Sequence, residues 1–136
     1  MGIPVLIVNC DPAARKELRQ PLESAGYPVV EADDVEDGLA MLRTSEGAMV
    51  TLFNVTLFDN IIRGADGIAF LGAASYDARH GRKHAFVVVT PTPDQLQAAL
   101  GRLLAHLSIP VLAEPFSADE LVNAVDQATR FQFVAV

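Results

Sequence analysis

The chain alternates short, strongly apolar runs with segments of helical spacing, and this alternation constrains its fold more than any other feature. Leucine and β-branched residues dominate the runs, which is typical of strands buried on both faces of a parallel sheet. Strands that alternate with helices predict right-handed crossovers and an α/β fold with helices on both faces of the sheet. We expect strands at residues 4–8, 28–32, 49–53, 85–90 and 109–113.

Caps and breakers mark the helices between these runs. Asp11 and Pro12 suit the N-cap and first turn of a helix that continues to about residue 25. Pro21 lies inside this helix and lacks a backbone donor, so we expect a kink there. The later helices are expected to begin near residues 35, 66, 93 and 118.

Length and composition indicate one domain. The chain has 136 residues, of which 51% are hydrophobic, so residues 1–136 are expected to form a single unit with its core in residues 4–130. Residues 131–136 are interpreted as an apolar tail beyond the last helix, expected to pack on the domain, on a partner or as an added strand. No apolar run reaches the roughly 20 residues of a membrane span, and no signal segment opens the chain. We therefore expect a cytoplasmic protein without membrane contact.

Charge and cysteine content exclude several functions. The formal net charge of −7 repels phosphate backbones, which argues against nucleic-acid binding. Cys10 is the single cysteine, so it forms no internal disulfide and makes a poor zinc site. We interpret it as a packed thiol rather than a redox sensor, and we expect no metal and no cofactor. The basic residues at 79–84 are interpreted as a solvated loop, with the docking of an anion or acidic partner as the alternative.

Polar residues follow the predicted strands, and the carboxyl ends of parallel strands form the working crevice of such sheets. The residues at those ends are Asn9, Cys10, Asp11, Asn54, Thr90 and Glu114.

Two stretches, VLIVNCDPAARKELRQPLESAGYPVVEADDVEDGLAML and PVLAEPFSADELVNAV, give the chain a family resemblance. From residue 5 to about residue 130 the sequence resembles the receiver domain of two-component response regulators, the CheY-like group. The resemblance implies a single flavodoxin-like (βα)5 domain, a doubly wound parallel sheet with strand order 2-1-3-4-5. It also implies a non-enzymatic part in a phosphorelay.

Receiver domains accept a phosphoryl group on an aspartate that ends the third strand, with Mg²⁺ held by that aspartate and two acids after the first strand. A hydroxyl after strand four and a lysine after strand five contact the phosphoryl oxygens. The resemblance places Asn9 and Cys10 at the acidic pair, Asn54 at the acceptor, Thr90 at the hydroxyl and Glu114 at the lysine. Only Thr90 keeps its type. An amide is no nucleophile for an acyl phosphate, and Mg²⁺ prefers carboxylate oxygen, so the sequence predicts neither phosphorylation nor metal binding.

An insertion follows the acceptor position. Asp66, which the resemblance places at the start of the third helix, comes twelve residues after Asn54, so residues 57–65 contain an insertion. We expect an apolar loop that lids the crevice. Asp59 in this insertion, with Asp11 as a metal ligand, is a possible substitute acceptor, although a solvated loop acid is the favoured interpretation.

Two further expectations come from the resemblance alone. The peptide bond between Glu114 and Pro115 stands where the family has a cis bond, and we expect it to be cis. Val111 occupies the position of an aromatic residue that reports phosphorylation in the family, so that readout is expected to be absent.

The combined prediction is a pseudo-receiver that acts as a protein-interaction module in signal transduction. Its expected partner is a histidine kinase or an effector domain. The fourth helix has more leucines than one buried stripe requires, and the resemblance implies dimerisation through helix four, strand five and helix five, so we expect a homodimer there. The alternatives are a small-ligand sensor that uses the former active-site pocket, and a receiver phosphorylated at Asp59.

Overall fold

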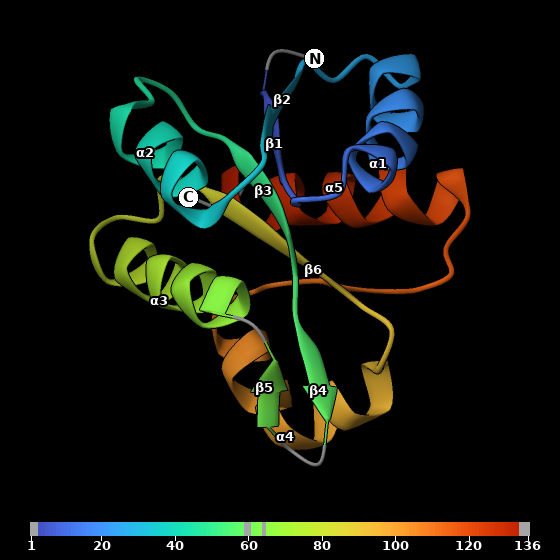
Figure 1. Cartoon of the computed structure of the whole chain (residues 1–136). Helices are drawn as coiled ribbons and strands as arrows, with labels where there is room; N and C mark the ends of the chain where they lie inside the picture. Colours follow the sequence, from blue (N-terminus) through green and yellow to red (C-terminus); the bar gives the residue numbers. More distant parts are fainter. Residues whose placement is uncertain (1–2, 59–60, 64, 134–136) are drawn as a thin grey trace.

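The computed structural model describes residues 3–58, 61–63 and 65–133 of the chain. Its main sheet has five parallel strands in the order β2-β1-β3-β6-β7 (Figure 1). Because β6 and β7 are the fourth and fifth strands of this sheet along the chain, the expected order 2-1-3-4-5 is confirmed. The strands are β1 Val5–Val8, β2 Val29–Ala32, β3 Val50–Asn54, β6 Ala85–Thr90 and β7 Val111–Ala113.

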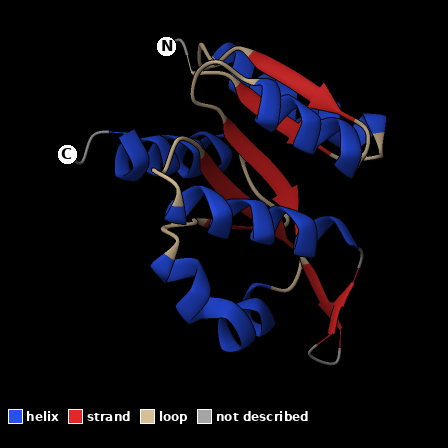
Figure 2. Cartoon of the chain, turned by 90° about the vertical axis from the view of Figure 1, so that its left-hand side faces the viewer, coloured by secondary structure: helices blue, strands red, loops and turns tan. Residues whose placement is uncertain are grey.

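Helices cover both faces of the sheet (Figure 2). The apolar sides of α1 and α5 pack on one face through residues such as Leu22 and Leu121, which are fully buried. The other face is covered by α2, α3 and α4, with Phe70 and Leu96 fully buried beneath them. The helices are α1 Pro12–Ser24, α2 Val35–Thr44, α3 Ala65–Arg79, α4 Pro93–His106 and α5 Ala118–Phe133.

The predicted caps are present. The Asp11 side chain accepts a hydrogen bond from the Ala13 amide at 3.0 Å, and Pro12 opens the first turn of α1. Pro21 lies inside this helix, and the kink expected there stays a prediction. Gly26 follows with φ of +95°, a left-handed conformation that suits a residue without a Cβ.

The insertion is a β-hairpin, so the expectation of a loop is wrong. Thr56–Phe58 forms β4 and Ile61–Arg63 forms β5, which pair antiparallel with Leu57 opposite Ile62. Val55 and Leu57 are buried while Thr56 between them is half-buried, the two-residue alternation of a strand. Two residues separate these strands, the commonest length of a hairpin connection.

The last helix is longer than expected. Helix α5 continues to Phe133, so residues 131–133 belong to it and not to a tail. The physical reason is that neither glycine nor proline occurs after Pro115, and nothing in the sequence stops the helix at residue 130. Residues 134–136 lie outside the described part of the chain. None of the helices within the described ranges has the length and apolar character of a membrane span.

Candidate functional site

Four of the predicted site residues lie at one edge of the sheet. Asn54 ends β3 opposite Val89, and Thr90 ends β6 opposite Ala113. Asn9 follows β1 directly, and its amide donates to the Ala32 carbonyl at 3.1 Å. The Glu114 amide, just after β7, donates to the Thr90 carbonyl at 2.8 Å. The fold therefore brings Asn9, Asn54, Thr90 and Glu114 to the carboxyl ends of neighbouring strands, as the sequence predicted.

The side chains after β1 are committed to local structure. The Asn9 Oδ1 atom accepts a hydrogen bond from the Asp11 amide at 2.8 Å, and the Asp11 carboxylate caps α1. Asp11 is exposed, and Cys10 is exposed as well. The interpretation of Cys10 as a packed thiol is therefore wrong, because the turn into α1 directs this position toward solvent.

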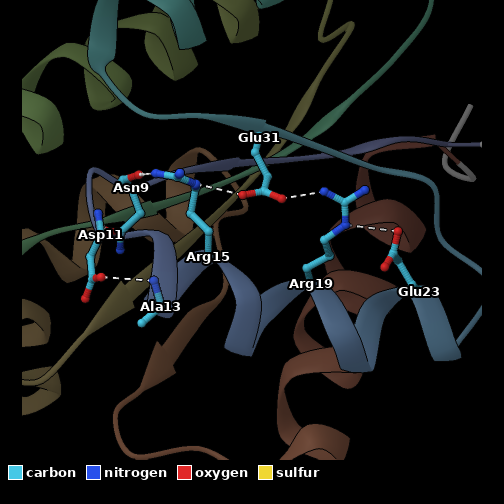
Figure 3. Close-up of polar contacts among 7 residues, drawn as sticks. All are labelled: Asn9, Asp11, Ala13, Arg15, Arg19, Glu23 and Glu31. Carbon is cyan, nitrogen blue, oxygen red and sulfur yellow. Dashed lines mark hydrogen bonds and ion pairs between the residues drawn. The ribbon is translucent and has the colours of Figure 1, made fainter.

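A guanidinium occupies the neighbourhood of Asn9 (Figure 3). Arg15 donates through Nη1 to the Asn9 carbonyl at 2.5 Å and through Nε to Glu31 Oε1 at 2.7 Å. Its side chain is 16% exposed, so the positive charge is held close to the strand end. Receiver chemistry needs a Mg²⁺ ion beside this strand end. Here a guanidinium whose charge is balanced by Glu31 lies there, and this ion pair adds no net negative charge to attract a divalent ion.

The Arg15 contact belongs to a longer ion-pair network. Arg19 donates to the second carboxylate oxygen of Glu31 and forms an ion pair with Glu23 at 3.0 Å. The hydrogen bonds from Arg19 and Arg15 lower the pKa of Glu31 below its usual range. Glu31 raises the pKa of the Arg19 guanidinium in return. The sequence prediction missed this network, although the arginines are four residues apart on α1 and the strand order places β2 beside β1.

The Thr90 hydroxyl is internally bonded. Thr90 is fully buried, and its Oγ1 atom accepts a hydrogen bond from the Thr92 amide at 3.0 Å and lies 3.2 Å from Thr92 Oγ1. Thr92 Oγ1 in turn accepts from the Leu57 amide at 3.3 Å. The one hydroxyl that the family uses is thus linked through Thr92 to the first strand of the hairpin.

The hairpin extends beyond β3 beside α4 and away from the end of β1 (Figure 1, Figure 2). Leu57 is 2% exposed and packs in the same core cluster as Leu96 of α4. Apolar packing against α4 therefore directs the described hairpin strands away from Asn9. Residues 59, 60 and 64 of the insertion lie outside the described part of the chain, so the expectation that it lids the crevice stays a prediction.

The residues at this edge do not fit the magnesium site of a receiver. Asn9 uses its side-chain oxygen on a backbone amide, Asp11 caps a helix, and Asn54 offers a neutral amide. Mg²⁺ sheds water reluctantly and needs carboxylate charge to bind. Within the described ranges, three acids that could converge on a metal, Asp33, Asp34 and Asp37, lie after β2 and are all exposed.

The remaining site predictions have mixed outcomes. The Glu114–Pro115 peptide bond is cis, as expected. Val111 begins β7 and is half-buried. Asp59 lies outside the described residues, so its role as a substitute acceptor stays a prediction.

Comparison with known proteins supports the fold assignment. No protein-family model and no curated protein sequence matches the chain. Solved structures do match. A sensor protein from Polaromonas sp. JS666 is 20% identical with a TM-score of 0.73, covering 97% of this chain and 99% of the other. A CheY-like response regulator receiver domain protein from Methanospirillum hungatei JF-1 is 19% identical with a TM-score of 0.68, covering 96% and 95%.

Full-length FixJ from B. japonicum, a longer protein, also matches. It is 22% identical with a TM-score of 0.70, and the match covers 98% of this chain but 60% of FixJ. At these identities the likeness establishes the fold. The chain has the fold of CheY-like receiver domains, and the resemblance inferred from the sequence is confirmed at that level.

Proposed function

We propose that this chain is a non-enzymatic signalling module of the receiver fold that acts through protein contacts and is not phosphorylated at its strand ends. The observation that carries the proposal is the Arg15 guanidinium on the Asn9 carbonyl, beside an edge where Asn54 stands at the acceptor position. A guanidinium that contacts this strand end and a neutral amide at the acceptor position withhold the carboxylate charge that both the metal and the phosphoryl transfer require.

Glu114 adds to this argument. Its backbone is anchored to Thr90 at the end of β6, and its side chain is exposed at the same edge. A carboxylate there supplies negative charge where a phosphoryl group needs a cation to balance it. The edge therefore lacks carboxylates at the acidic-pair and acceptor positions and carries an acid where the phosphoryl group needs a cation.

The test is incubation with acetyl phosphate and Mg²⁺, followed by intact-mass analysis and hydroxylamine treatment, which cleaves acyl phosphates. We expect no phosphoryl adduct. The positive control is the variant Asn9→Asp, Cys10→Asp, Asn54→Asp, Glu114→Lys, which restores the family residues. A hydroxylamine-sensitive adduct on the unmodified chain would overturn the proposal, and its loss in Asp59→Ala would assign the adduct to the substitute acid.

The partner of such a module would be a histidine kinase or an effector domain, and a second copy of this chain is the other candidate. A groove of about 580 Å³ runs between α4 and α5 over β7, with Gly101, Ala105 and Ile109 in its lining. Strand β7 is an outermost strand of the sheet, and Leu103 on α4 is 37% exposed. These features support dimerisation through α4, β7 and α5.

Light scattering after size exclusion tests the dimer. The variant Ala105→Glu places a charge in the groove and is expected to shift the protein to monomer. Ala99→Glu is the matched control, since Ala99 is exposed on the same helix, outside the lining of this groove and on the helix face turned away from it. A monomeric unmodified chain, or equal effects of the two variants, would contradict this interface.

A further inference from the structure

A groove of about 620 Å³ lies between α2 and α3, at the end of the sheet opposite the strand ends described above. Its lining includes Phe86, the second residue of β6, together with residues from the last turns of both helices. The volume falls within the range of small-molecule sites, about 300–1,000 Å³. A ligand pocket was expected at the carboxyl ends of the strands, whereas this groove is at their amino ends.

The groove is open because α3 lines it with small side chains, and its floor is apolar. Ala69 and Ala73 lie one turn apart on α3 and contribute only methyl groups, which leaves space between α3 and α2. Leu42 and Phe86 close the space from below and are 7% and 2% exposed.

An aromatic pair forms part of the wall. The rings of Tyr76 and His80 stack with centroids 3.9 Å apart and planes inclined by 19°. Tyr76 is 61% exposed, although its large aromatic side chain is of a kind that proteins usually bury in large part. Both residues line the groove, at the level of the last turn of α3.

The charges around the groove are basic. Arg43, in the last turn of α2, is exposed and makes no hydrogen bond or ion pair with the described part of the chain. Lys83 is also in the lining, and its ammonium donates to the Ser45 carbonyl at 2.5 Å. Arg43 and Lys83 therefore give the groove two positive charges, although the formal net charge of the chain is −7.

The acid in the lining is already bonded. The Asp77 carboxylate accepts the backbone amides of Lys83 at 3.1 Å and His84 at 3.0 Å. The Asp77 carbonyl accepts the Arg82 amide at 2.7 Å. The basic segment 79–84, interpreted from sequence as a solvated loop, is therefore fixed against α3 and presents Lys83 and His80 to the groove.

We propose that this groove binds a small aromatic carboxylate. A flat ring system fits against the Tyr76–His80 pair and the alanine methyl groups, where stacking and apolar burial favour it. The carboxylate pairs with the guanidinium of Arg43, whose planar fork of donors matches two carboxylate oxygens, and Lys83 adds a second cation. The site is independent of phosphotransfer, because it lies at the other end of the sheet.

The test uses 2-naphthoate as the probe and two-dimensional NMR of the ¹⁵N-labelled full chain. We expect saturable shifts of the Ala69, Ala73 and Arg43 amides with a Kd of about 1 mM or tighter. The neutral analogue 2-naphthylmethanol reports the ring contribution and is expected to bind about fivefold more weakly or worse. Acetate reports the charge alone and is expected to leave these amides unshifted.

Variants separate the two halves of the site. Arg43→Gln is expected to weaken 2-naphthoate about fivefold and leave 2-naphthylmethanol unchanged, while Ala73→Leu fills the groove and abolishes both. Arg102→Gln, an exposed arginine on α4, is the matched control and is expected to bind like the unmodified chain. Thermal melts of each variant verify folding. Unsaturated shifts at 10-fold the expected Kd, shifts mapped elsewhere, or equal affinity in Arg43→Gln and Arg102→Gln would each overturn the proposal.

Discussion

The Leu57 amide donates a hydrogen bond to the Thr92 hydroxyl at 3.3 Å, joining the inserted hairpin to the loop between β6 and α4. Thr92 also contacts the buried Thr90 hydroxyl, so the two threonines and the hairpin strand form one hydrogen-bonded chain. In an active receiver the hydroxyl at the Thr90 position must be available to the phosphoryl group. Here the Thr90 hydroxyl bonds to Thr92, and Thr92 in turn holds the hairpin through the Leu57 amide.

Replacing Thr92 with valine tests how firmly this link holds the hairpin. The substitution keeps the shape and removes the acceptor for the Leu57 amide, which is expected to cost about 1 kcal/mol of the free energy of unfolding. Urea denaturation measures the loss, and hydrogen exchange of the Leu57 amide is expected to accelerate. Thr44→Val is the control, because the Thr44 hydroxyl donates to the Ala40 carbonyl in an exposed turn of its own helix. Unchanged exchange at Leu57 would show that the hairpin does not depend on this bond.

The Arg19–Glu31–Arg15 network predicts a pH dependence with a definite sign. Because Arg19 and Arg15 lower the pKa of Glu31 in the folded state, the ion pairs contribute stability above pH 4.5, the ordinary value for Glu. That contribution is lost as the pH falls from 4.5 through the lower pKa of the folded state. NMR titration of the Glu31 carboxyl carbon measures this pKa. In Arg19→Gln it is expected to rise toward the ordinary value, whereas Arg130→Gln, at the exposed end of α5, is expected to leave it unchanged.

Tyr27, between α1 and β2, offers a spectroscopic test of the packing of this connection against α5. Burial and the hydrogen bond that its hydroxyl donates to Asp126 raise its pKa to about 12. The folded state favours the neutral phenol, so this stabilisation is present below the ordinary pKa of 10.0 and is lost as the pH rises through about 12. The chain has two tyrosines and no tryptophan, so Tyr76→Phe leaves Tyr27 as the only chromophore for a titration of tyrosinate absorbance.

A second variant separates the contributions of burial and of the Asp126 charge to the raised pKa of Tyr27. Asp126→Asn in the Tyr76→Phe background keeps an oxygen acceptor and removes the charge, so the pKa of Tyr27 is expected to fall while burial still holds it above 10.0. A midpoint near 10.0 before the Asp126 substitution, with the protein still folded by circular dichroism, would contradict the described environment of this phenol.

The sheet could be predicted from the sequence because strand identity depends on local apolar runs, and the order of strands followed from a family resemblance. The positions of Asn54, Thr90 and Glu114 at one edge followed in turn, since parallel strands end together. The hairpin could not be predicted in the same way. Its strands are three residues each, too short for periodicity to separate strand from loop. Its direction depends on the packing of Leu57 against α4, a contact between distant residues.

The surroundings of the site were less predictable than its positions. Arg15 reaches Asn9 because α1 lies over β1 and β2, and Glu31 holds the guanidinium from the neighbouring strand. The α2–α3 groove exists because small side chains on α3 face α2, and its charges come from segments that meet only in the folded chain. Predicting such features requires knowledge of the distances between helices and strands, which hydrophobic periodicity does not supply.

Two helical glycines give a matched test of the packing that sets this distance. A Cβ added at Gly38 in α2 would lie 2.9 Å from the Phe70 ring and 3.0 Å from a Val8 methyl, so the helix approaches β1 and α3 only without a side chain there. Gly38→Ala gains about 1 kcal/mol of helix propensity, but overpacking typically costs 1–3 kcal/mol, roughly as much or more. We expect a net loss of stability in urea denaturation. Gly72→Ala in α3, where a Cβ would meet nothing within 4 Å, is expected to stabilise the protein by up to about 1 kcal/mol. Stabilisation by both substitutions would contradict the close approach of α2 to β1.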